Sequence, residues 1–119
     1  MTAMQGNSAL EQRQVRAAKN QSLFREVNDR IEELQATATF VEFACECVDT
    51  DCTGAVPMTH EEYERMRRIP THFVVLHGHV IADVERVVEE TDRYVIVEKL
   101  GAGGPTAIRF DPRSRPTRR

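Results

Sequence analysis

The chain has 119 residues and a formal net charge of −3, and it is 40% hydrophobic and 29% charged. This composition is typical of one soluble globular domain and excludes a largely disordered chain. No apolar run approaches the roughly 18 residues that a membrane-spanning helix needs, so we expect no membrane association. The first residues lack a basic start followed by an apolar stretch, so we expect no signal peptide and a cytoplasmic protein.

A long N-terminal helix is the first expected element. Residues 1–8 are expected to be disordered, and the helix is expected to run over 9–36. Leu23, Val27, Ile31 and Leu34 fall at helical spacings and form one apolar stripe, which Phe24 widens. The first half of this helix has few apolar residues. We therefore expect that half to project from the domain or to pair with a second chain, which would give a homodimer.

Strand-type residues follow the helix. The stretch 39–46 is rich in aromatic and small apolar residues, and turn residues separate it from a short returning strand at 55–58. Thr59 and Glu62 have the spacing of a capping box, which predicts a short second helix from His60 to about Arg68.

The rest of the predicted domain is antiparallel sheet. We expect a strand over 73–76 and a hairpin over 84–90 and 94–99, with a helix over 80–90 as the alternative. The chain is therefore interpreted as a single α+β domain over 9–100. Since a domain of this size buries limited apolar surface, a stabilising metal is plausible.

A flexible tail rich in Gly, Pro and Arg is expected over 101–119. Between 109 and 119 five arginines face one aspartate, while the body of the domain is acidic. An acidic body is not typical of a protein that binds duplex DNA. The tail alone could contact a nucleic acid, through Arg113, Arg115, Arg118 and Arg119.

The chemistry of the sequence is concentrated in Cys45, Cys47 and Cys52, which lie within eight residues. Alternate residues of a strand point to the same face, so the first two thiols should lie on one side of the backbone. The turn that follows should place the third thiol near the first two. Three clustered thiols suit a tetrahedral zinc site, which needs one more ligand. The preferred fourth ligand is His79, beside the flexible Gly78, and His77 is its competitor.

Other interpretations of the cysteines remain open. The three thiols could be reduced residues near a small core, or they could carry redox or nucleophilic chemistry. A catalytic zinc would keep an open coordination position, and Glu46, Asp49 or Asp51 could then act as a base, although these acids are expected to face solvent.

Residues 20–99 resemble a group of small, uncharacterised bacterial proteins that are common in actinobacteria. The motifs that carry the resemblance are NQSLFREVNDRI, FACEC followed by a third cysteine, VPMTHEEY, Gly78-His79, ERVVEE and YVIVEK. The resemblance implies no established activity. It does imply that the histidine of the Gly-His turn accompanies the three cysteines, which favours His79. The group often has proline before this glycine, where the present chain has His77.

These patterns together predict a non-enzymatic, zinc-stabilised interaction or regulatory module that binds a protein partner. Two alternatives follow from the same residues. One is a nucleic-acid- or ribosome-associated factor that uses the arginine tail, and the other is a small zinc-dependent hydrolase.

Overall fold

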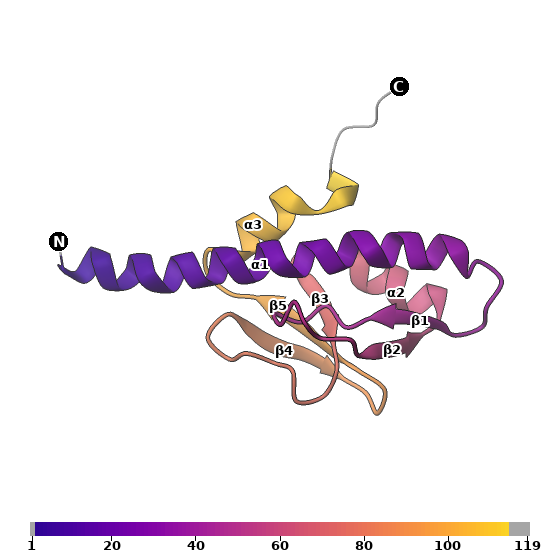
Figure 1. Cartoon of the computed structure of the whole chain (residues 1–119). Coiled ribbons are helices and arrows are strands. Elements are labelled where there is room, and N and C mark those ends of the chain that lie inside the picture. The colour runs from indigo at the N-terminus through magenta and orange to yellow at the C-terminus, as the bar shows by residue number, and fades with distance from the viewer. Residues whose placement is uncertain (1, 115–119) are drawn as a thin grey trace, which may run out of the picture.

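The structure is a computed structural model that describes residues 2–114, with side chains from Ala9 to Arg113. It is an α+β fold in which a long helix lies along one side of two small antiparallel sheets (Figure 1). The elements in chain order are α1 (Thr2–Leu34), β1 (Val41–Ala44), β2 (Ala55–Met58), α2 (His60–Arg67), β3 (His72–Val75), β4 (Glu85–Glu90), β5 (Val95–Lys99), α3 (Gly103–Phe110) and the 3₁₀ turn η1 (Pro112–Ser114). Within residues 2–114, no helix combines the length and apolarity that crossing a membrane requires.

The expected single sheet is divided into two. Strands β1 and β2 form a hairpin, and β3, β5 and β4 form a three-stranded sheet in that spatial order. The hairpin predicted over the last two strands is confirmed, and the alternative helix over 80–90 is wrong. The division arises because β1 ends at Ala44. The chain then joins the free edge of β3 through one backbone hydrogen bond, from the amide of Glu46 to the carbonyl of Val74, at 2.8 Å.

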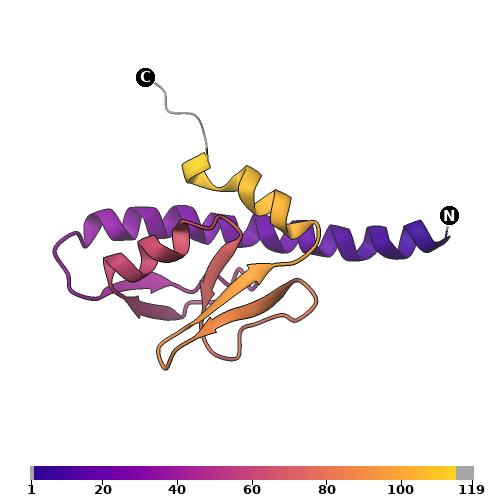
Figure 2. The same ribbon diagram turned by 180° about the vertical axis from the view of Figure 1, so that it is seen from behind.

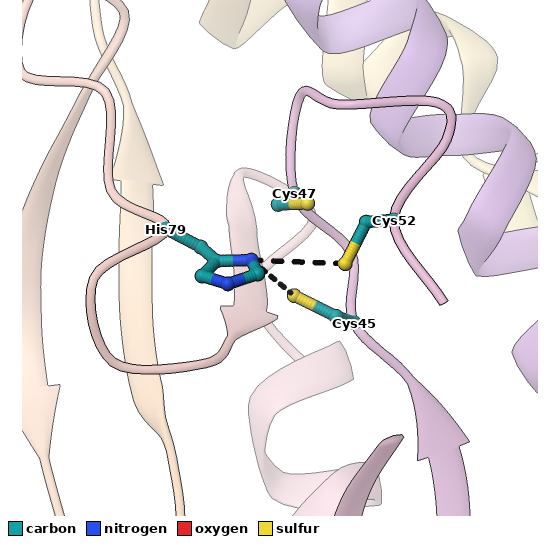
Figure 3. A group of neighbouring side chains, drawn as sticks. All are labelled: Cys45, Cys47, Cys52 and His79. Atoms are coloured by element: carbon teal, nitrogen blue, oxygen red, sulfur yellow. Dashed lines mark hydrogen bonds between the residues drawn. The ribbon is translucent and has the colours of Figure 1, made fainter. Parts of the chain in front are cut away.

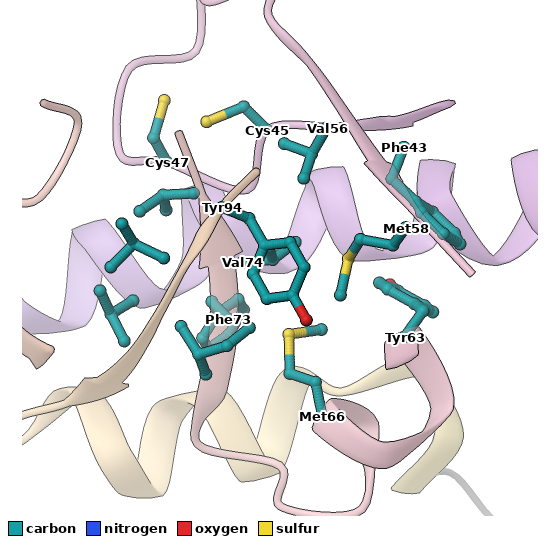
Figure 4. Close-up of a cluster of buried hydrophobic side chains, with 14 of the residues drawn as sticks. Phe43, Cys45, Cys47, Val56, Met58, Tyr63, Met66, Phe73, Val74 and Tyr94 are labelled. Atoms are coloured by element: carbon teal, nitrogen blue, oxygen red, sulfur yellow. The ribbon is translucent and has the colours of Figure 1, made fainter. Parts of the chain in front are cut away.

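The apolar core lies between the two sheets and α2. On the β1–β2 hairpin one face is buried, because Val41 and Phe43 pair with Met58 and Val56. The Phe43 ring stacks on Tyr63 of α2, with ring centroids 4.1 Å apart. The side chains from both sheets and from α2 meet in one cluster, and Cys45 and Cys47 lie at its edge (Figure 4). The core therefore leads directly into the cysteine cluster.

Helix α1 presents to the core a different face from the one predicted. Leu23, Val27 and Leu34 are 59%, 49% and 76% exposed, whereas Arg25 and Asn28 are fully buried. The buried face consists of small and polar residues: Gln14, Ala17, Ala18, Gln21, Ser22, Arg25 and Asn28. The expectation that the apolar stripe packs on the domain is wrong for Leu23, Val27 and Leu34, and only Ile31 of the stripe packs against the core. The reason is that the sheets offer unpaired backbone and charged groups to α1, which polar side chains satisfy.

Arg25 illustrates this polar docking. Its guanidinium lies over the Phe73 ring, 3.8 Å from the centroid, and donates to the carbonyl of Pro70 at 2.9 Å and to that of His72. A second buried group joins Lys99 of β5 to Glu85 of β4 at 3.1 Å, and Lys99 also donates to Gln21 of α1. Since buried charges are tolerated only when paired, these contacts fix how α1 sits on the sheets.

The ends of the chain are more ordered than predicted. Helix α1 begins at Thr2, so residues 2–8 are helical where disorder was expected. The turns of α1 near its N-terminus extend past the sheets, as Figures 1 and 2 show from opposite sides. The expectation of a flexible tail over 101–119 is wrong for 103–114, where α3 and η1 form. Arg115, Arg118 and Arg119 lie outside the described residues.

Helix α3 is held because its buried residues are small. Gly103 lets its first turn approach α1 closely, since a Cβ on Gly103 would lie 3.2 Å from the carbonyl oxygen of Gln14. Ala107 and Asp111 are also buried. The Asp111 carboxylate binds Arg67 of α2 at 2.6 Å and lies 3.7 Å from Arg25. The segment after Gly101 is therefore part of the domain.

We predict that Asp111→Ala lowers the free energy of unfolding by about 3 kcal/mol, because two buried guanidinium groups lose a counter-charge. Urea denaturation measures this change, and Asp92→Ala in an exposed turn is the control, expected within about 0.5 kcal/mol of the parent. A chain truncated after Phe110 that unfolds at the same urea concentration as the parent would instead support the flexible-tail interpretation.

Candidate metal centre

Cys45, Cys47, Cys52 and His79 converge where the β1–β2 connection meets the turn after β3 (Figure 3). Cys45 directly follows β1, Cys47 is two residues further on, and Cys52 lies at the end of the following turn. Within this turn the amide of Cys52 donates to the carbonyl of Asp49 at 3.1 Å. The structure thus brings together the four residues that the sequence proposed as ligands.

The turn after β3 positions the imidazole of His79. Gly78 has φ of +84°, a left-handed backbone conformation that residues other than glycine rarely adopt. The amide of His79 donates to the carbonyl of Leu76 at 3.1 Å, which closes the turn. The His79 side chain is thereby directed toward the thiols.

The distances between the candidate ligand atoms fit an ion with tetrahedral coordination. One ligand atom from each residue lies within 4.8 Å of all the others. The Nδ1 atom of His79 lies 3.6 Å from the Cys45 sulfur and 3.7 Å from the Cys52 sulfur. Zinc–sulfur bonds of about 2.3 Å and zinc–nitrogen bonds of about 2.0–2.1 Å, at tetrahedral angles, put sulfur and nitrogen about 3.6 Å apart. The four side chains therefore need little rearrangement to hold one ion.

Backbone amides face two of the sulfurs. The amide of Leu76 donates to the Cys45 sulfur at 3.3 Å, and the amide of Gly54 donates to the Cys52 sulfur at 3.4 Å. Such donors stabilise a thiolate more than a thiol, because they offset its negative charge. They also orient the ligands, as outer partners do in metal sites.

His77 does not contribute to the cluster. Its ring contacts the carbonyl of Thr91 at 2.6 Å and the Glu90 carboxylate at 3.2 Å, on the far side of the turn. Its side chain is 45% exposed. The neighbouring Leu76 instead packs against the core.

Glu46 is the functional residue that sequence reasoning missed. It was expected to face solvent, but it is fully buried between the two cysteines that flank it. Its carboxylate accepts from the Tyr63 hydroxyl at 2.8 Å, from Asn28 at 2.9 Å and from the amide of Val74 at 3.2 Å. Strand alternation gives the signal: when Cys45 and Cys47 point one way, the residue between them points the other way, into the domain. Asp49 and Asp51 are exposed, as expected.

One side of the cluster is open to solvent. A shallow hollow of about 250 Å³ is lined by Cys47, Val48, Asp49, Gly78, His79 and Ile81. Cys45 and Cys47 themselves are 1% and 2% exposed. An ion can therefore enter from this side, while the sulfurs remain largely shielded from water.

Burial raises the pKa of the Cys45 thiol, and it raises the pKa of the Cys47 thiol in the same way. The negative charge that a second nearby thiolate would carry adds to the effect at Cys45. Both groups are therefore protonated at neutral pH when no cation is present. A bound cation must displace these protons.

Comparisons of the chain with protein-family models, with curated proteins and with solved structures find no match. The assignment of the site consequently rests on its own geometry and donor chemistry.

We predict that metal binding at pH 7 releases about two protons or more, because the thiols of Cys45 and Cys47 must lose theirs. Titration calorimetry in buffers of different ionisation enthalpy measures this number. Since the pKa values are raised, affinity should increase with pH and acid should release the metal. An affinity that stays constant between pH 6 and 8 would contradict thiolate ligation.

Proposed function

We propose that Cys45, Cys47, Cys52 and His79 hold one structural zinc ion, and that the domain is a non-enzymatic module that binds a protein partner. The convergence of three sulfurs and one imidazole nitrogen within 4.8 Å carries this proposal. Sulfur with one nitrogen is the donor set of structural zinc sites, and iron–sulfur clusters commonly use four thiolates. Three thiolates that must stay reduced also favour a reducing compartment such as the cytoplasm.

The closed donor set disfavours the hydrolase alternative. A catalytic zinc keeps three protein ligands and one position for water, but here four candidate ligand atoms lie within 4.8 Å of one another. Of the acids considered as a general base, Asp49 lines the hollow beside the cluster, but the four candidate donors already make up a tetrahedral set. Glu46 points into the domain, where Tyr63 and Asn28 occupy its oxygens.

Zinc in this position would join two parts of the chain that are distant in the sequence. Cys45, Cys47 and Cys52 belong to the β1–β2 hairpin, and His79 belongs to the connection between β3 and β4. The two sheets share one backbone hydrogen bond beside this site, between Glu46 and Val74. The ion would therefore stabilise the junction of the sheets.

The nucleic-acid alternative gains no support from the part of the tail that the structure describes. Arg113 binds Glu64 at 2.8 Å and Asp29 at 2.9 Å, and lies 3.5 Å from Glu32. These carboxylates neutralise the cation that the alternative would use. The exposed apolar residues of α1 instead favour a protein partner.

We predict about one zinc per chain in protein purified without chelator, and faster zinc loss from His79→Ala than from the parent. Zinc transfer to a colorimetric chelator measures the rate. His77→Ala is the matched control, because it removes an imidazole from the same turn without touching the cluster. Fast loss from His77→Ala with slow loss from His79→Ala would reverse the ligand assignment, and less than about 0.2 zinc with no other metal would refute the site.

We predict that Cys47→Ser lowers the free energy of unfolding by at least about 3 kcal/mol, because the free energy of metal binding contributes to folding in small domains. Thermal unfolding with and without excess chelator measures the effect. Thr53→Ala, an exposed change in the same loop, is the control. An unchanged melting temperature for Cys47→Ser would argue that the cluster has no structural role.

A further inference from the structure

The outward face of α1 has the spacing of a helix-pairing seam. Leu23, Val27 and Leu34 are half-exposed or more, on the side opposite the buried Arg25 and Asn28. Arg16, Asn20 and Arg30 continue the same row, so that successive positions alternate steps of four and three residues. This alternation is the heptad spacing by which two helices pack side by side. We call this row, Arg16, Asn20, Leu23, Val27, Arg30 and Leu34, the outer seam.

The outer seam is exposed to solvent except at Asn20, which is half-buried. In Figure 1 no other element crosses in front of α1, and in Figure 2, from behind, α2 and α3 pass in front of it while the sheets lie below it. The other elements therefore all cover one side of α1. Its opposite side is free to contact a second molecule.

We propose that the outer seam pairs with the outer seam of a second copy of this chain, with the two α1 helices antiparallel. This inference rests on the proposed function only in that it identifies the protein partner as a second copy of the chain. It does not require the metal. Three apolar residues in a seam about 27 Å long predict a weak dimer, with a dissociation constant on the order of 1–100 µM.

Charge selects the antiparallel orientation. In a parallel pair, Arg16 would face Arg16 and Arg30 would face Arg30, which places like charges in the seam. In an antiparallel pair centred between Leu23 and Val27, Leu23 of each copy lies beside Val27 of the other copy. Arg30 then lies beside an asparagine, Asn20. Arg16 lies beside Leu34, which can cover its aliphatic stem.

The charged residues beside the outer seam also favour the antiparallel orientation. Lys19, Glu26 and Glu33 are exposed and seven residues apart on one side of it. In antiparallel pairs this flanking row faces itself, so Lys19 of each copy lies opposite Glu33 of the other. At the centre, Glu26 of one copy faces Glu26 of the other copy. This contact lies at the solvent-exposed margin, where one like-charge contact costs little. Two favourable pairs therefore outweigh one unfavourable contact.

Sedimentation velocity of the full, metal-loaded chain between about 1 and 500 µM tests the proposal. A concentration-dependent dimer is expected, and Leu23→Glu should raise its dissociation constant by about a hundredfold, since two charges would be buried in the seam. Ile69→Glu is the matched control. It introduces the same charge at a 47% exposed apolar residue outside the seam, and it should leave the dimer unchanged.

Charge reversal tests the orientation. Lys19→Glu and Glu33→Lys should each weaken the dimer about tenfold, and the double variant should recover the parent value because the pairs are restored with exchanged signs. Zero-length cross-linking of the parent should join Lys19 of one copy to Glu33 of the other.

A parent that remains monomeric at 500 µM overturns the proposal, as does a dimer that Leu23→Glu does not weaken. A double variant as weak as the single variants overturns the antiparallel orientation. Zinc content is measured on the same samples. A monomer with one zinc per chain would leave the proposed metal site standing, whereas a dimer without zinc would refute the metal site alone.

Discussion

The buried carboxylate of Glu46 is the contact on which the other parts of the structure depend. It lies between Cys45 and Cys47, two of the proposed metal ligands, and receives hydrogen bonds from α1, α2 and β3, through Asn28, Tyr63 and the amide of Val74. Arg25 adds a positive charge 3.6 Å away. A buried carboxylate that lost these partners would be strongly destabilising, so the cysteine loop and α1 have to be placed together.

This constraint explains why α1 turns its polar face inward. Gln21 donates to the carbonyl of Glu46 at 2.8 Å, and Asn28 both donates to and accepts from the backbone of Ala44. The helix therefore completes the hydrogen bonding of a strand end that no neighbouring strand covers. An apolar face would leave these backbone groups unsatisfied, at a cost of about 1–3 kcal/mol each. The leucines and valine of α1 are consequently left on the outside.

Local signals in the sequence predicted the elements that local chemistry determines. The capping box of Thr59 and Glu62 forms as expected, and α2 begins at His60. Strand β2 has the predicted bounds, and the cysteines and His79 come together because strand alternation and the Gly78 turn act over few residues.

The errors concern features that depend on distant residues. The stripe on α1 was placed inward because apolar periodicity does not show which polar groups the sheets would present. Helix α3 was missed because Gly103, Gly104 and Pro105 are typical of loops, while the close approach to α1 that favours glycine at position 103 is visible only in three dimensions. Likewise the sequence of α2 does not show that Arg67 is buried, because its partners Asp29 and Asp111 lie on α1 and after α3.

The unequal spacing of the four proposed ligands along the chain has a consequence for the order of assembly. The three cysteines lie within eight residues, whereas His79 comes 27 residues after Cys52. As the chain leaves the ribosome, the thiols are therefore available well before the strand and turn that deliver the imidazole. An ion captured by the thiols would keep one exchangeable position until β3 is laid against Glu46. Closure of that position by His79 would then mark the completion of the domain, and a chain arrested before residue 79 should exchange its metal rapidly.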